Sequence, residues 1–286
     1  MISICVYGSQ ARNRTDQFSD RDVLMVARCS QTVEDYRRHW EASGWNVSFF
    51  TCEHFERLVD FKSLFIQHLK LEGLIIRDDE AFLQRRLTNF QPAQTYIEEL
   101  KDALLPATWE NGEEANYWAD LCLGDILFVA MRNAAILHSA TSGKHIYDYK
   151  QLIDHVTAAF RLTRLQRAAL LGLRTMKAAY RSRRHGVELG TILPQAIGAM
   201  QNIRNVVLPL RDVSTTGFVP NNYHALRKAE LDLVRFHDPR YLDKLDPSEE
   251  AYGLWQLVCN PADYPKMRAA PRAVIRPWLS YKDAQR

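Results

Sequence analysis

The sequence predicts an α+β fold, in which a small mixed sheet is followed by an all-helical domain. Over the first ninety of 286 residues, short runs typical of strands alternate with helical patterns. After about residue 90 the strand patterns stop, and the rest of the chain reads as helices separated by turn residues. We therefore expect domains at 1–90 and 91–212, and a helical or irregular extension at 213–286.

Candidate strands and helices alternate through the first ninety residues. The strands, rich in β-branched, aromatic and aliphatic residues, are expected at 2–7, 22–27, 45–50 and 73–77. The helices are expected at 9–14, at 31–43 with Thr32 as the N-cap, and at 52–70 with a break near Asp60. Gly44 and Gly73 are expected to end two of these helices, because glycine readily adopts the conformations found at helix C-termini.

The chain after residue 90 reads as a series of helices. They are expected at 92–105, 113–140, 147–159, 163–184, 188–208 and 222–236. Residues such as Pro106, Gly112, Gly186 and Pro209 separate them, because proline and glycine interrupt helices. The proline-rich tail from about Asp238 is expected to be irregular, with one short helix near 248–258.

The composition is that of an ordinary globular protein, with 47% hydrophobic and 25% charged residues. The net charge of +3 is too small to indicate nucleic-acid binding by itself. Five cysteines without close pairs favour reduced thiols in the cytoplasm over a disulfide framework or a cysteine zinc site. The chain shows no signal-peptide pattern and no apolar run of the ~18–20 residues that span a bilayer, so we expect no membrane association.

Polar residues that suit phosphate and metal binding follow the first strand and open the second. Gly8 and Ser9 form a turn where backbone N–H groups and a hydroxyl can meet phosphate, and Arg12 adds a positive charge. Asp20 and Asp22 are two residues apart, so both carboxylates can lie on one face of a strand. Such a pair suits a hard divalent cation such as Mg²⁺.

This order of residues resembles the DNA polymerase β-like nucleotidyltransferase superfamily, in its small bacterial type with a helical C-terminal half. The matching segments are Gly8-Ser9-Gln10-Ala11-Arg12 and Ser19-Asp20-Arg21-Asp22-Val23. The resemblance covers about residues 1–80. It implies transfer of a nucleoside monophosphate from an NTP to an acceptor hydroxyl, with Mg²⁺ or Mn²⁺ as cofactor. By this resemblance Gly8 and Ser9 hold the triphosphate, while Asp20 and Asp22 are the catalytic metal ligands.

The chain departs from the family at a third acidic residue, which members commonly carry on a later strand. Ser48 aligns with that position and Asn46 is the other choice, but neither is an acid. A base could come from elsewhere, with candidates Glu72, Asp78, Asp120 and Asp125. Alternatively, two carboxylates suffice, or the chain is a degenerate member that binds nucleotide or RNA, or acts as a partner or antitoxin subunit, without turnover.

Charged residues in helical segments have both structural and functional interpretations. His68 and Glu72 are one helical turn apart and are expected to form a structural pair rather than a metal or catalytic pair. Asp120 and Asp125 suit either a catalytic role or an internal ion pair with arginine, and Arg132 or Lys144 could contact phosphate.

Two further patterns concern possible RNA partners. Arg132 and His138 have the spacing of HEPN ribonuclease motifs, although they lie in an apolar helix. Basic residues recur along 161–185, which fits a solvated helix face or a phosphate-rich acceptor such as tRNA. The sequence leaves open whether the acceptor of the transfer is RNA, a protein or a small molecule. By family analogy we expect a defence or toxin–antitoxin context, with a partner protein or a homo-oligomer.

Overall fold

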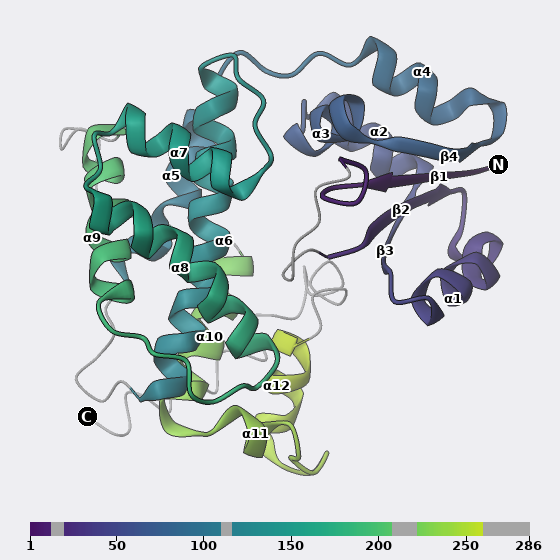
Figure 1. Cartoon of the computed structure of the whole chain (residues 1–286). Coiled ribbons are helices and arrows are strands. Elements are labelled where there is room, and N and C mark those ends of the chain that lie inside the picture. Colours follow the sequence, from purple (N-terminus) through teal and green to yellow (C-terminus); the bar gives the residue numbers. More distant parts are fainter. Residues whose placement is uncertain (13–19, 110–115, 208–221, 260–286) are drawn as a thin grey trace. The chain divides into compact units, whose positions relative to one another are not determined.

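The computed structural model of the chain describes residues 1–12, 20–109, 116–207 and 222–259. Within these ranges it contains one four-stranded mixed sheet and many helices (Figure 1). The predicted α+β class and the mixed sheet are therefore confirmed. Ser19 and the end of the helix expected at 9–14 lie outside the described residues, as do the boundary predicted at 212 and most of the C-terminal tail.

The four predicted strands are all present, each within one residue of its expected position. They are β1 (Ile2–Tyr7), β2 (Asp22–Ala27), β3 (Asn46–Thr51) and β4 (Leu74–Asp78). Their order is β3-β2-β1-β4. Strand β1 is antiparallel to β2 and β4, whereas β2 and β3 are parallel. This topology places the end of β1 beside the start of β2, where Tyr7 pairs with Asp22.

Helices cover both faces of this sheet (Figure 1). On one face lie α2 (Cys52–Asp60), α3 (Leu64–Glu72) and α4 (Phe82–Asn89). Their buried side chains, including Phe55, Ile66 and Leu83, pack with Cys5 and Leu24 of the sheet. The opposite face packs against α1 (Glu34–Ala42) and the short 3-10 helix η1 (Ser30–Val33). Burial of apolar side chains on both faces stabilises the sheet.

Three local predictions for this region need correction. Thr32 is not the N-cap of the helix, because it lies inside η1, where its hydroxyl contacts the Sγ atom of Cys29 at 3.0 Å. Residues 9–12, the described part of the helix expected at 9–14, form turns and no helix. The break expected near Asp60 is confirmed, because α2 ends at Asp60 and α3 begins at Leu64, with Lys62 at φ 55° between them. Helix α4 and the short 3-10 helix η2 (Asp79–Ala81) were not predicted.

The helices predicted after residue 90 are present, mostly with shorter ends. They are α5 (Ile97–Ala103), α6 (Tyr117–Thr141), α7 (Tyr149–Ala159), α8 (Arg164–Arg181), α9 (Ile192–Val207), α10 (Asn222–Phe236) and α12 (Glu250–Cys259). Two short helices accompany them, η3 (Leu105–Thr108) and α11 (Pro239–Leu242).

The chain divides into two compact units that are not consecutive in sequence. One unit, called the sheet unit here, consists of residues 1–100 and 134–156. The other, the helical unit, consists of residues 101–133 and the chain from 157 onward. Helix α6 contributes its first part to the helical unit and its last part to the sheet unit.

Among the described helices, α6 is long and apolar enough to cross a membrane by length and composition. Its most apolar window has a mean hydropathy of 1.4, and 67% of that window is buried inside the structure. The core helix of a globular protein has the same properties, so this feature is weak evidence for a membrane span.

Candidate functional site

The turn after β1 lies directly beside the start of β2. Gly8 has φ +78°, in the left-handed region that favours glycine. A Cβ atom added at Gly8 would lie 3.4 Å from the Oδ2 atom of Asp22, so the absence of a side chain brings the backbone close to that carboxylate. The Ser9 hydroxyl donates to the backbone carbonyl of Asp20 at 3.4 Å. The structure therefore brings together Gly8, Ser9, Asp20 and Asp22.

The two aspartates differ in exposure. Asp20 is exposed and Asp22 is partly buried at the first position of β2. Asp22 pairs with Asn46 in the parallel β2–β3 register, and the Asn46 Nδ2 atom lies 3.5 Å from Asp22 Oδ1. Carboxylate and amide oxygens are suitable ligands for Mg²⁺, so this edge of the sheet has the donor chemistry for a divalent ion.

The position expected to carry a third acid holds no carboxylate. Ser48 pairs with Leu24 of β2, and the hydroxyls of Ser48 and Tyr7 lie 3.4 Å apart. Nowhere in the described ranges do three or more His, Cys, Asp or Glu side chains form a group that could hold a metal ion. A metal ion at this site would therefore depend on Asp20 and Asp22, with further ligands from substrate oxygens and water.

Arg12 and Glu72 form an ion pair beside this turn. The Arg12 Nη1 atom contacts the Glu72 Oε2 atom, and each side chain is 18% exposed. The same carboxylate oxygen lies 2.9 Å from the Nε2 atom of His68. Burial raises the pKa of the Glu72 carboxyl, but the hydrogen bonds and the charges of His68 and Arg12 together outweigh burial, so that its pKa lies below the ordinary value. The expected His68–Glu72 pair is therefore present, and it also engages Arg12.

Aromatic rings fix the position of His68. Its ring stacks on Tyr147 with centroids 4.2 Å apart and an interplanar angle of 17°. Tyr7 meets it edge-on, with centroids 5.9 Å apart. The Tyr147 hydroxyl donates to the backbone carbonyl of Leu64 at 3.2 Å. His68 is thus held between rings from β1 and from the segment before α7.

The other residues predicted for phosphate contact are Lys144 and Arg132. Lys144 is exposed in the turn after α6, and its charge lies close enough to His155 to help lower the pKa of that imidazole, after the larger effect of burial. In the part of the chain that the structure describes, no hydrogen bond or ion pair joins Lys144 to the Gly8–Ser9 turn. Arg132 is partly buried on α6, within the helical unit.

Of the two helical aspartates, Asp125 belongs to a buried ion network. It is fully buried, and its Oδ2 atom lies 2.6 Å from Arg181 and 2.7 Å from Arg227. Arg227 also pairs with Glu230, which accepts a hydrogen bond from the Tyr180 hydroxyl. The internal Asp–Arg pair is therefore what the structure shows for Asp125. Asp120 is partly buried in the first turn of α6.

The basic segment 161–185 serves structural roles at several positions. Arg181 pairs with Asp125, while Arg183 binds the Asp243 carboxylate through two nitrogens, at 2.8 and 3.1 Å. Other arginines of this segment are exposed, namely Arg161, Arg164 and Arg184. His138 of the HEPN-like spacing packs against His155, with ring centroids 5.2 Å apart.

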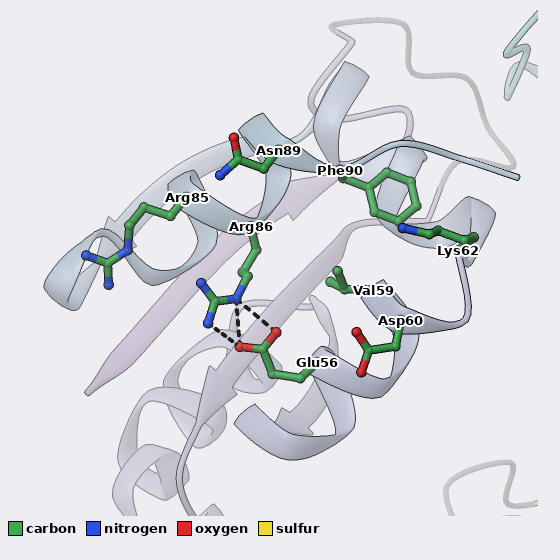
Figure 2. A pocket seen from close by; sticks show the side chains of 8 residues that line it. All are labelled: Glu56, Val59, Asp60, Lys62, Arg85, Arg86, Asn89 and Phe90. Atoms are coloured by element: carbon green, nitrogen blue, oxygen red, sulfur yellow. Dashed lines mark hydrogen bonds and ion pairs between the residues drawn. The ribbon is translucent and has the colours of Figure 1, made fainter.

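A cavity of about 490 Å³ lies between α2 and α4, apart from the residues predicted for the site. Its lining side chains are Glu56, Val59, Asp60, Lys62, Arg85, Arg86, Asn89 and Phe90 (Figure 2). Glu56 and Arg86 form an ion pair within it, and Arg85 points away from that pair (Figure 2). The charges of opposite sign that line this cavity neutralise each other in part, so it indicates no particular ligand.

Comparison of the chain with protein-family models, with curated proteins and with solved structures gave no match. A functional conclusion therefore depends on the residues of the site. Sequence reasoning identified Gly8, Ser9, Asp20 and Asp22 as neighbours, but it missed the roles of Tyr7 and Tyr147. Tyr147 lies 79 residues beyond His68 in the chain, and no local pattern signals their contact.

Proposed function

We propose that this chain is a Mg²⁺-dependent nucleotidyltransferase, which transfers a nucleoside monophosphate from an NTP to an acceptor hydroxyl. The observation that carries the proposal is the close approach of the Gly8–Ser9 turn to Asp20 and Asp22. Residues 1–90 would then be the nucleotidyltransferase core, with residues 91–212 as a helical domain. Mn²⁺ is a second suitable cofactor, because it also favours oxygen ligands.

Each residue of the turn has a chemical role in this proposal. Backbone N–H groups at Gly8 and the Ser9 hydroxyl would bind phosphate oxygens, and Arg12 would add charge. Asp20 and Asp22 would hold the metal, which when bound neutralises charge on the phosphates and on the departing pyrophosphate. Catalysis of this kind depends mainly on positioning and electrostatic stabilisation.

A second function, nucleotide binding without turnover, is favoured by a specific observation. On β3, Asn46 pairs with Asp22 and Ser48 pairs with Leu24, and neither side chain can act as a carboxylate base. Glu72, a candidate base, is engaged by both Arg12 and His68. Asp125 is engaged by two arginines. A protein that binds NTP and metal through the turn alone could serve as a partner or antitoxin subunit.

The proposal also covers the acceptor and the cellular context. The exposed arginines of segment 161–185 support an RNA acceptor such as tRNA, because they offer charge for a phosphate backbone. A protein hydroxyl or a small molecule are the other acceptor classes. We place the protein in the cytoplasm, in a defence or toxin–antitoxin context with a partner protein or a second copy.

The test combines nucleotide binding with label transfer. The protein is incubated with Mg²⁺ and each α-labelled NTP, with and without bulk tRNA, and pyrophosphate release, label transfer and retained label are measured. Asp20→Asn and Asp22→Asn are each expected to lower transfer by at least about 100-fold, because each removes a metal ligand. Asp60→Asn, the same change at the α2–α4 cavity, is the matched control and should leave transfer unchanged.

The outcomes separate the two functions. Transfer that disappears in both site variants supports the enzyme. Mg²⁺-dependent binding without transfer, lost in Asp22→Asn, supports the binding protein. If the wild-type chain neither binds nor transfers any of the four nucleotides, both proposals are wrong.

A further inference from the structure

Arg12 is attached to the Gly8–Ser9 turn and has an unused buried donor. Its backbone N–H donates to the Gly8 carbonyl at 3.3 Å, so the side chain starts one helical turn beyond the glycine. The Nη1 atom contacts Glu72, whereas the Nε atom is buried and has no hydrogen-bond partner among the described residues. A buried donor without an acceptor is unfavourable, and the oxygens of an anionic ligand would satisfy it.

The carboxylate that binds Arg12 is itself fixed on its other side. One oxygen, Glu72 Oε2, is shared between Arg12 and the Nε2 atom of His68. His68 is only 6% exposed and lies flat against the Tyr147 ring. A fixed imidazole restricts the rotamers of Glu72, and a fixed Glu72 restricts those of Arg12. All these residues belong to the sheet unit.

We infer that Glu72 and His68 are positioning residues that hold Arg12 for contact with the phosphates of a nucleoside triphosphate. This inference rests on the proposed nucleotide site and adds a role that a catalytic base would not have. The lowered pKa of Glu72 agrees with it, because a carboxylate stabilised in its charged form is a weak proton acceptor. Glu72 then acts through Arg12 and touches neither the reacting phosphate nor the acceptor.

Arg12 would then recognise the phosphate chain of the nucleotide. Glu72 already offsets much of the charge of Arg12, so the arginine would contribute mainly oriented N–H donors. The affinity gain of a triphosphate over the corresponding monophosphate should therefore depend on Arg12 and on the residues that position it.

A double-mutant cycle tests whether Glu72 acts on nucleotide binding through Arg12. Binding of each labelled NTP and NMP in Mg²⁺ is measured by equilibrium dialysis for the wild type, Arg12→Ala, Glu72→Gln and the double variant. Each single change is expected to weaken NTP binding by about tenfold, with little effect on NMP binding. The double variant should bind as weakly as Arg12→Ala alone, because Glu72 acts through Arg12. Glu56→Gln, the same change in the Glu56–Arg86 ion pair, is the matched control and should bind normally.

Other results would overturn the inference. Additive losses, or normal NTP binding by Glu72→Gln, show that Glu72 does not act through Arg12, while the proposed nucleotide site stands. If the wild type binds no NTP, the site and the inference both fall. Should Glu72→Gln not fold by circular dichroism, His68→Phe carries the same test. It keeps the stacking ring on Tyr147 and removes the bond to Glu72, so it should weaken NTP binding only when Arg12 is present.

Discussion

Cys29 differs chemically from the other cysteines of the chain. It is exposed, and its Sγ atom lies 3.0 Å from the Thr32 hydroxyl. Hydrogen bonds from the side chain and the backbone of Thr32 lower the pKa of the Cys29 thiol. Burial raises the pKa of Cys5 to about 12 and that of Cys259 to about 11. Cys52 and Cys122 also have raised pKa values because of burial.

Cys29 should therefore react first with an alkylating reagent, because the thiolate is the nucleophile. At pH 7.5 with limiting iodoacetamide, mass spectrometry should find Cys29 modified several-fold faster than any other cysteine. Thr32→Val removes the hydroxyl and should slow the modification of Cys29. Equal labelling of Cys29 and Cys259 would contradict this prediction.

At the residue scale, the candidate site was predictable where its parts are close in sequence. Gly8, Ser9 and Asp22 lie within fifteen residues and are joined by one antiparallel strand pair, so a strand–turn–strand pattern indicates their proximity. The Arg12–Glu72 ion pair spans 60 residues, and its formation depends on how α3 packs on the sheet. Such a contact follows from tertiary packing and has no local signature.

At the element scale, the strands were predictable because their apolar runs are short and end at turn residues. Helix α4 was missed, although the acidic residues Asp78, Asp79 and Glu80 precede it and are typical of a helix start. Glu80 and Ala81 adopt φ values of 59° and 49°, which non-glycine residues rarely do. The Asp78 carboxylate accepts hydrogen bonds from the backbone N–H groups of Leu83 and Gln84, and so stabilises the first turn. An unusual local backbone and the Asp78 carboxylate thus define the start of this helix.

Gly73 illustrates an element junction that depends on one missing side chain. It joins α3 to β4, and an added Cβ atom would lie 2.5 Å from the Leu69 carbonyl oxygen and 2.8 Å from Cys5 Sγ. Gly73→Ala is therefore expected to lower the free energy of unfolding by about 1–3 kcal/mol, because helix and strand must move apart.

Chemical denaturation followed by circular dichroism measures this loss. The matched control is Gly253→Ala in α12, where an added Cβ atom meets nothing within 4 Å. That change should be neutral or stabilising by up to about 1 kcal/mol, because alanine favours helix more than glycine does. Equal effects at Gly73 and Gly253 would show that the α3–β4 junction tolerates a side chain.

At the scale of the whole molecule, partly buried histidines should make stability depend on pH. Burial lowers the pKa values of His138, His145 and His155 below their ordinary value of 6.5. The folded state then binds fewer protons than the unfolded state in mildly acidic solution. Their stabilising contribution is complete above pH 6.5 and is lost as the pH falls from 6.5 through their lowered folded-state pKa values.

The free energy of unfolding should therefore decrease between pH 7.5 and pH 5.5. Carboxylates such as Glu72 and Asp243 have lowered pKa values, so their contributions are lost only at lower pH. His155→Gln should reduce the pH dependence, measured by denaturation at both pH values. His39→Gln, at an exposed position on α1, is the control. A stability that rises toward pH 5.5 would contradict the prediction.

The discontinuous sheet unit has a consequence for the order in which the chain is made. All four strands have been synthesised once residue 78 is added, yet the ring that stacks on His68 comes from Tyr147. Residues 101–133, which include most of the apolar helix α6, are synthesised before Tyr147. Their Asp125 has no arginine partner until Arg181 and Arg227 have also been made. A chain that ended at Thr141 would thus expose His68 without its stacking ring, together with an apolar helix whose Asp125 lacks its arginine partners, a state that chaperones would bind.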